Sequence, residues 1–261
     1  MAPLEALDAS EVRGLLFDLD DTVTTHGKLT SAAYAAMERL HASGRIVVAV
    51  TGRPAGWCDH IARMWPVDAV VGENGAFYFW YDARARRLER HYHDSSKARQ
   101  ANRARFAEIA ERILREVPGC ALSADQPYRE TDLAIDYCED VPALPLESAE
   151  RIAALMREAR LTAKVSSIHV NGWFGAYDKL GMALRMLRER FALESPVARQ
   201  TIAFVGDSPN DAPMFEFFSH SIGVANIAQF GGHLSIAPRY VTQEEAGAGF
   251  VQVVEHLLAR A

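Results

Sequence analysis

The sequence contains little cysteine, and this scarcity excludes several classes of protein. Only three of the 261 residues are cysteine, and Cys58, Cys120 and Cys138 do not have the paired spacing of a metal site. An odd number of isolated cysteines is typical of reduced thiols, whereas a disulfide scaffold needs an even set of pairs. We therefore expect a cytoplasmic protein in which the three thiols have structural roles.

Long apolar runs and a surplus of basic residues are also absent. No stretch approaches the roughly 18 apolar residues of a membrane span, and the acidic start MAPLEALDASEVRG lacks the apolar core of a secretory signal. The formal net charge of -6 offers no basic patch to nucleic acid. We expect a monomer or homodimer with no nucleic-acid or membrane partner. An anionic small molecule would have to be attracted locally, by a metal or by a few lysines and arginines.

What the sequence does contain is an alternation of short apolar runs with amphipathic stretches. Apolar content of 49% and charged content of 24% are ordinary for a globular protein. The runs are continuously apolar, which is typical of parallel strands covered by helices on both faces. The sequence thus predicts an α/β fold with a Rossmann-like parallel sheet. Its strands are expected at residues 12–19, 46–50, 68–71, 201–205, 221–224 and 240–242, and its helices between residues 30 and 44, after Pro54, at 179–191 and at about 249–258.

The pattern changes in the middle of the chain. An aromatic run at 77–81 and a cationic one at 84–93 predict a hairpin that leaves the core. Strands of antiparallel type then alternate with two amphipathic helices, which predicts an inserted α+β domain. The helices are expected at 99–117 and 147–160, and the strands at 133–137, 162–165 and 168–170. We accordingly divide the chain into a first core segment at 1–81, an insert at 82–171 and a second core segment at 172–261.

Three carboxylates end the first predicted strand, within LLFDLDDTVTTHG at residues 15–27. If residues 12–19 form a strand, its period of two places Asp18 and Asp20 on one side, at the sheet edge where open α/β sheets bind ligands. Two carboxylates this close repel each other unless a cation lies beside them, and Mg²⁺ prefers such oxygen ligands. The alternative is that an aspartate caps the next helix, which suits Asp21 better than it suits the pair.

Two more predicted strands end in polar clusters. Thr51 follows the second strand, and Asp207, Asn210 and Asp211 follow the strand predicted at 201–205. Parallel strands place these ends on one edge of the sheet, so residues far apart in sequence converge. Each cluster alone could be a helix cap or a turn. Three clusters at corresponding strand ends favour a functional site.

Lys179 departs from a local rule. A lysine in the first turn of a helix opposes the helix dipole, and the helix predicted at 179–191 begins with this residue. Such departures are expected at functional sites, although a solvent-exposed lysine is a common alternative.

The same residues carry a family resemblance. Asp18-Leu19-Asp20-Asp21-Thr22-Val23, Thr51-Gly52-Arg53-Pro54, Lys179 and Gly206-Asp207-Ser208-Pro209-Asn210-Asp211 resemble, in order and spacing, the four motifs of the haloacid dehalogenase-like superfamily. The insert lies between the second and third motifs, which resembles a type II cap, here of the C2B kind. Glu73-Asn74-Gly75-Ala76 is similar to a segment common in subfamily IIB, the Cof-type sugar phosphatases. Within it, the motifs are most similar to those of mannosyl-3-phosphoglycerate phosphatases, followed by sucrose- and trehalose-phosphate phosphatases.

The resemblance implies a Mg²⁺-dependent phosphatase that acts on a phosphomonoester of a sugar or a glycosyl-phosphoglycerate. It implies that Asp18 is the nucleophile that forms an aspartyl-phosphate, and that Asp20 protonates the leaving oxygen and then deprotonates the attacking water. The implied metal ligands are Asp18, the main-chain carbonyl of Asp20, Asp207 and, through water, Asp211. Thr51 and Lys179 would bind the phosphoryl oxygens, and Asn210 would orient Lys179 or the phosphate.

Substrate specificity is expected from the cap, because the core motifs touch only the phosphoryl end. Candidates by position are Arg53 and Asn74 from the core and Arg129, Ser166, His169 and Asn171 from the insert. For each of these, a surface or packing role is the alternative. Two other functions stay open: a phosphomannomutase-like phosphotransferase, which shares the motifs, and a non-enzymatic receiver-like phosphoacceptor, which is normally about half this length.

Overall fold

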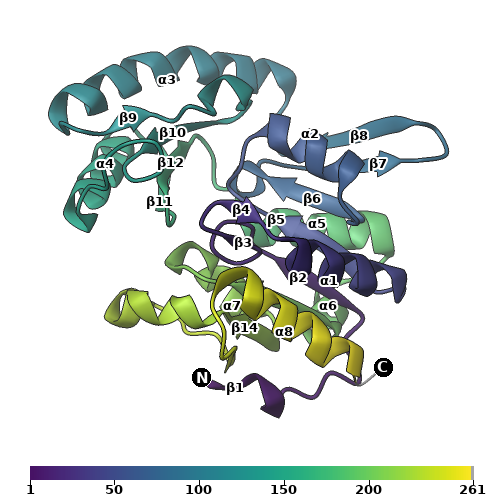
Figure 1. The fold of residues 1–261 in the computed structure, drawn as a ribbon. Helices are drawn as coiled ribbons and strands as arrows, with labels where there is room; N and C mark the ends of the chain where they lie inside the picture. Colours follow the sequence, from purple (N-terminus) through teal and green to yellow (C-terminus); the bar gives the residue numbers. More distant parts are fainter. Residues whose placement is uncertain (260–261) are drawn as a thin grey trace.

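The computed structural model describes residues 1–259 as a large α/β core with a smaller unit inserted into it. The core sheet has nine strands in the order β1-β15-β14-β13-β2-β5-β6-β7-β8. Figure 1 shows the inserted unit beside this core. Their bounds are β1 Ala2–Pro3, β2 Gly14–Phe17, β5 Ile46–Val50, β6 Ala69–Gly72, β7 Phe77–Asp82, β8 Arg87–Tyr92, β13 Ile202–Gly206, β14 His220–Gly223 and β15 Tyr240–Val241. The predicted fold class is confirmed.

The central strands are parallel and buried on both faces, as their continuous apolar runs predict. Helices α1 (Ser31–Ala42), α2 (Ala55–Met64) and α8 (Ala246–Ala259) pack on one face through a single apolar cluster. Helices α5 (Lys179–Phe191), α6 (Ser195–Thr201) and α7 (Ala212–Phe217) pack on the other. Among residues 1–259, no helix combines the length and the apolar character needed to span a membrane.

The hairpin β7–β8 extends the core sheet. Strand β7 pairs antiparallel with β6, for example Val71 with Tyr78, and β8 pairs antiparallel with β7. The division predicted from the sequence assigns residues from 82 onward to the insert. Because backbone hydrogen bonding joins β8 to the core, we propose that the insert begins near Ser95 and ends near Trp173.

The insert is a four-stranded antiparallel sheet in the order β11-β12-β10-β9 with two helices on one face. Its elements are α3 (Ser96–Glu116), β9 (Ala121–Leu122), β10 (Asp132–Asp136), α4 (Leu146–Glu158), β11 (Thr162–Val165) and β12 (His169–Trp173). Leu133, Ile135 and Val170 face α3 and α4. Because side chains alternate along a strand, Asp132, Asp136, His169 and Asn171 fall on the opposite face. This polar face supplies the residues that meet the core.

One premise of the sequence argument is wrong. Strand β2 is Gly14–Phe17 and not residues 12–19, so Asp18 and Asp20 both come after the strand. Their positions are set by the loop that follows β2, which closes through backbone hydrogen bonds from Thr22, Val23 and Thr24 to Leu19 O. Strand periodicity therefore does not account for their proximity. The short hairpin of β3 (Thr24–Thr25) and β4 (Lys28–Leu29) follows this loop.

Candidate active site

Three buried carboxylates meet at the carboxyl ends of β2 and β13. Asp18 directly follows β2, and its N–H donates a hydrogen bond to Val205 O at 3.0 Å, which continues the ladder by one residue. Asp207 directly follows β13, and Asp211 closes the turn η4 (Pro209–Asp211). One carboxylate oxygen of each aspartate lies within 4.8 Å of the others. The parallel sheet thus brings together residues almost 190 positions apart, as the strand-end argument predicted.

Lys179 projects into this cluster from the first turn of α5. Its Nζ lies 3.0 Å from Asp18 Oδ1 and 2.8 Å from Asp211 Oδ1. Asp178 caps the helix by accepting a hydrogen bond from Gly181 N at 2.7 Å. The two ion pairs hold Lys179 at an otherwise unfavourable helix position. The alternative of a solvent-exposed lysine is wrong, because this side chain is buried.

A glycine allows the start of α5 to approach so closely. Gly75 has a φ of +102°, and a Cβ built on it would lie 1.9 Å from Asp178 O and 2.8 Å from Lys179 N. No larger residue fits there without moving the backbone that carries Lys179. Gly75 therefore helps to place Lys179.

The charges of the cluster do not balance. Three carboxylates surround one ammonium group, and all four side chains are almost fully buried. Burial raises the pKa of the Asp18 carboxyl to about 7, against the opposing effect of Lys179. Burial also raises the pKa of Asp207 well above its usual range, and Asp18 and Asp211 raise it further. A second cation would relieve this excess of negative charge.

Asp207 has an oxygen that suits a metal ion. Its Oδ1 accepts a hydrogen bond from Thr22 Oγ1 at 3.3 Å, whereas no described residue donates one to the buried Oδ2. Burying an unpaired carboxylate oxygen is costly, and hard divalent cations prefer such oxygens. The donor set of Asp18, Asp207 and Asp211 therefore fits the magnesium ion that the sequence predicts. The Oδ2 atom of Asp211 accepts hydrogen bonds from the backbone N–H groups of residues 207 and 208.

Arg53 holds the second aspartate of the first motif. Its backbone N–H donates to Thr51 Oγ1 at 3.0 Å, which fixes the turn after β5. Its Nε donates to both oxygens of Asp20, at 3.1 and 2.9 Å, and its Nη2 donates to Oδ1 at 2.8 Å. The same guanidinium reaches the insert, where its Nη2 lies 2.6 Å from Glu139 Oε1. Arg53 thus links the candidate proton donor to the insert.

The polar face of the insert carries a connected set of charges. His169 Nε2 lies 2.9 Å from Glu139 Oε2 and 3.3 Å from Ser123 Oγ. Arg129 is buried, pairs with Asp125 at 2.8 Å and Asp132 at 3.0 Å, and donates to the core at Gly52 O, at 2.9 Å. Asn171 Nδ2 donates to Asp132 Oδ2 at 3.0 Å. The two units are therefore joined by two arginines, Arg129 reaching from the insert to the core and Arg53 reaching from the core to the insert.

A small cavity of about 20 Å³ separates the core motifs from the insert. Eight residues singled out in the sequence line it: Asp18, Asp20, Arg53, Asn210, Arg129, Ser166, His169 and Asn171. Gly52, Ser167, Ile168 and Ser208 complete the lining. Most candidates for substrate contact thus surround one space, which lies between the two units as the cap argument predicted.

Some candidates lie elsewhere or have other partners. Asn74 does not line the cavity; it is buried against Gly52 with a positive φ of 56°. Asn210 Oδ1 accepts a hydrogen bond from Ser208 Oγ at 2.8 Å, and Lys179 is oriented instead by Asp18 and Asp211. Thr51 is buried behind the cavity wall.

Sequence reasoning missed Glu139 and Glu73. Glu139 follows β10 in a turn whose N–H groups at residues 138, 139 and 140 donate to Asp136. Glu73 is fully buried and accepts backbone N–H bonds from Ala55 in the core and from Glu130 and Thr131 in the insert. Its place at the start of the 73–76 segment, directly after Gly72 at a predicted strand end, was an available signal for Glu73. No periodic pattern marks Glu139.

Comparisons with known proteins agree with this geometry. Residues 15–112 match the haloacid dehalogenase-like hydrolase family. A phosphoglycolate phosphatase of Methanothrix thermoacetophila is 32% identical over 137 residues, which cover 52% of this chain and 54% of that protein. A phosphoglycolate phosphatase of Methanosarcina acetivorans is 25% identical over 94% of this chain and 96% of its own length. The chain thus spans about half the length of the first relative and nearly all of the second.

Solved structures share the complete architecture. A protein of Thermoplasma acidophilum superposes with a TM-score of 0.72 at 18% identity, covering 95% of this chain and 98% of that one. A subclass IIB sugar phosphatase gives a TM-score of 0.61 at 15% identity, covering 94% and 98%. These likenesses show that the chain has the fold of that subclass IIB protein, an α/β core with a small antiparallel insert. In sequence, the match to this family is confined to residues 15–112, which contain the first two of the four motifs.

Proposed function

We propose that this phosphatase hydrolyses a small phosphorylated carboxylic acid of the 2-phosphoglycolate type through an aspartyl-phosphate on Asp18. The observation that carries the proposal is that Arg53, which binds the carboxylate of Glu139 at 2.6 Å, lines the cavity between the core motifs and the insert together with Asp18. The cavity itself measures about 20 Å³. By the same measure, a single water needs roughly 10–15 Å³. With the insert in this position neither phosphoglycolate nor a glycosyl phosphate has room, so the insert must move to admit any substrate. A substrate with a carboxylate is favoured over the plain sugar phosphate expected from the sequence, because Arg53 binds carboxylates.

The relatives that are similar in sequence support the same substrate class. Both are named phosphoglycolate phosphatases, whereas the likeness to the sugar phosphatase is one of fold. Phosphoglycolate carries a phosphate at one end and a carboxylate at the other. The cavity offers cationic or hydrogen-bonding side chains at both of its sides, with Lys179 behind Asp18 and with Arg53 and His169 toward the insert.

In the proposed reaction, an oxygen of Asp18 attacks the phosphorus and the bond from phosphorus to the leaving oxygen breaks. Asp20 gives its proton to that oxygen, so an alcohol leaves. Asp20 then takes a proton from water, whose oxygen attacks the phosphorus and frees Asp18 and inorganic phosphate. Lys179 neutralises charge on Asp18 and on the phosphoryl oxygens, and Asp211 keeps its ammonium group in place.

A magnesium ion held by Asp18, Asp207 and Asp211, with the main-chain carbonyl of Asp20 as a further ligand, would neutralise charge on the phosphoryl group. The contribution of the chain is to collect these ligands at fixed strand ends and to leave Asp207 Oδ2 free of hydrogen bonds from the described residues.

We also assign to Arg53 a role in recognising the substrate. Its guanidinium already holds one carboxylate from the insert, Glu139, at 2.6 Å, and a planar guanidinium binds a carboxylate through two parallel hydrogen bonds. The carboxylate of a small acid would bind Arg53 at Nη1, whose contact with Glu139 is the longer one at 3.3 Å, while Glu139 stays paired with Nη2 and with His169.

A substrate panel tests the proposal. The purified protein with Mg²⁺ is assayed for phosphate release from 2-phosphoglycolate, glucose 6-phosphate, sucrose 6-phosphate and mannosyl-3-phosphoglycerate. We expect kcat/KM to be at least about tenfold higher for 2-phosphoglycolate than for the others, a difference of about 1.4 kcal/mol. Preference for a glycosyl substrate would overturn the assignment. Isomerised sugar phosphate in place of free phosphate would indicate a mutase, and a stable phosphoprotein would indicate a phosphoacceptor.

A further inference from the structure

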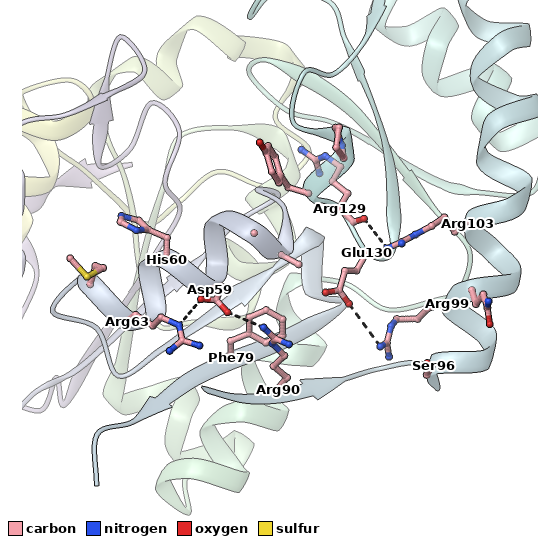
Figure 2. A pocket seen from close by; sticks show the side chains of 16 residues that line it. Asp59, His60, Arg63, Phe79, Arg90, Ser96, Arg99, Arg103, Arg129 and Glu130 are labelled. Carbon is pink, nitrogen blue, oxygen red and sulfur yellow. Dashed lines mark hydrogen bonds and ion pairs between the residues drawn. The ribbon is translucent and has the colours of Figure 1, made fainter. Parts of the chain in front are cut away.

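A second cavity, of about 940 Å³, lies outside the active site at another junction of core and insert. Its core side is formed by α2 and the hairpin β7–β8, and its insert side by α3 and residues 127–130 (Figure 2). Ligand pockets for small molecules typically measure about 300–1,000 Å³. The cavity can hold a molecule much larger than a single phosphate ion.

Arginines from both units surround this cavity. Arg63 and Arg90 approach it from the core, and Arg99 and Arg103 approach it from α3 (Figure 2). On α3, residues 96, 99, 100 and 103 follow a spacing of three, four and seven, which places them on one face of the helix. Phe106 lies on the same face two turns after Arg99 and packs into the insert, which fixes the rotation of the helix about its axis. The basic face is therefore directed at the cavity by the packing of the helix.

These arginines outnumber the acids beside them. Asp59 is shared by Arg63 at 2.6 Å and Arg90 at 2.9 Å. Glu130 lies 3.9 Å from Arg99. Four arginines thus face two carboxylates, an excess of two positive charges in a chain whose net charge is -6. Arg129 also lines the cavity, but Asp125 and Asp132 already neutralise it.

Arg103 has no acidic partner among the residues that the structure describes. Its Nη2 donates only to the main-chain oxygen of Arg129, at 3.0 Å. It also lies one helical turn from Arg99, and two like charges at this spacing destabilise a helix by about 0.2–0.5 kcal/mol. Arg99 is held over the ring of Tyr92, with its guanidinium carbon 3.5 Å from the ring centre. An anion between Arg99 and Arg103 would relieve their repulsion and gain charge-assisted hydrogen bonds.

We infer that this cavity is a binding site for a polyanion that carries at least two phosphate or carboxylate groups. Two surplus positive charges require a ligand with more than one negative charge, and arginine is the side chain best suited to such groups. The site is separate from the candidate active site, because Arg129 is the one described residue that lines both cavities. An occupant contacts the core and the insert together.

The inference is tested by calorimetric titration of tripolyphosphate, and in a parallel arm of citrate, into protein that has been stripped of metal with EDTA and then dialysed free of EDTA. Without metal, the carboxylates of Asp18, Asp207 and Asp211 repel anions, so the active site contributes little. We expect saturable binding that weakens at least about tenfold in Arg103→Glu, because a positive charge is replaced by a negative one. The better of the two probes identifies phosphate or carboxylate as the preferred group.

Arg115→Glu is the matched control, because Arg115 is exposed on the same helix and does not line the cavity. This variant should bind like the wild type, and Arg103→Lys should retain binding. Arg103 is itself exposed, so its variants should keep the melting temperature of the wild type. Failure of both probes to bind, or equal binding by Arg103→Glu and the wild type, would overturn the inference. Neither result depends on phosphatase activity.

Discussion

Arg53 of the core and Glu139 of the insert form an ion pair in which Nη2 and Oε1 are 2.6 Å apart. The same guanidinium donates to both oxygens of Asp20, the residue to which we assign proton transfer. Arg53 is almost fully buried, whereas Glu139 is partly exposed. The position of the insert is thus coupled to the surroundings of Asp20 through a single side chain.

Glu139→Gln tests this coupling. The substitution keeps the shape of the side chain but removes the charge that holds Arg53 toward the insert. We expect kcat/KM for the preferred substrate to fall about tenfold, or about 1.4 kcal/mol, because Arg53 and the insert are then less well placed. The control is Glu111→Gln, an exposed position on α3. Steady-state kinetics that do not distinguish the two variants would argue against the coupling.

Acid should weaken the same contact. Burial of Glu139 acts to raise the pKa of its carboxyl, but hydrogen bonds from His169 and Arg53 outweigh burial and lower the pKa from 4.5 to about 2. A depressed pKa stabilises the folded state above the unfolded value, and this stability is lost as the pH falls from about 4.5 toward 2. The free energy of unfolding should therefore differ between wild type and Glu139→Gln by about 1–2 kcal/mol at pH 6. The difference should shrink toward pH 3, and a constant difference would contradict the assignment.

Gly75→Ala should damage both stability and turnover. The new Cβ would overlap Asp178 O, and the positive φ adds a further cost of about 1 kcal/mol. Gly44→Ala is the control that isolates the backbone cost of a positive φ from the steric overlap. Gly44 has a φ of +81°, and nothing lies within 4 Å of the added Cβ. We expect Gly75→Ala to lose at least about 2 kcal/mol more than the control in chemical denaturation. Its kcat should also fall, because Lys179 moves with the start of α5. Equal losses in both variants would show that the contact is tolerated.

Asp207→Asn should have opposite effects with and without metal. In EDTA the substitution removes one of three mutually repelling carboxylates and preserves the acceptor for Thr22, so the melting temperature should rise by about 3 °C. With Mg²⁺ the wild type should be stabilised and the variant should not, because a ligand charge has been lost. A variant that is less stable in EDTA, or that responds to Mg²⁺ like the wild type, would count against the magnesium site.

The sequence was a good guide to the parts of the structure that local patterns determine. Continuous apolar runs located the parallel strands, and amphipathic spacing located α3, α4 and α5 close to their observed bounds. Polar residues at strand ends located Asp18, Asp207 and Asp211, because strand direction alone brings those ends together.

Features that depend on tertiary contacts were not predictable in this way. Helix α6 has only seven residues and no clear apolar stripe. The division predicted from the sequence assigns β8 to the insert because this strand is cationic, whereas its antiparallel pairing with β7, and that of β7 with β6, joins it to the core. Glu139 sits in a turn without periodicity, so its contact with Arg53 emerges only when the insert lies over the core.

The division of labour between Asp18 and Asp20 is tested most directly by trapping the covalent intermediate. Asp20→Asn protein is mixed with Mg²⁺ and p-nitrophenyl phosphate, whose leaving group needs no proton, and is then acid-quenched and analysed by peptide mass spectrometry. We predict that a phosphoryl group accumulates on Asp18, because the asparagine cannot activate water for the second step. No adduct should form in the Asp18→Asn variant. A phosphoryl group on another residue, or turnover by Asp18→Asn comparable to that of the wild type, would contradict the account.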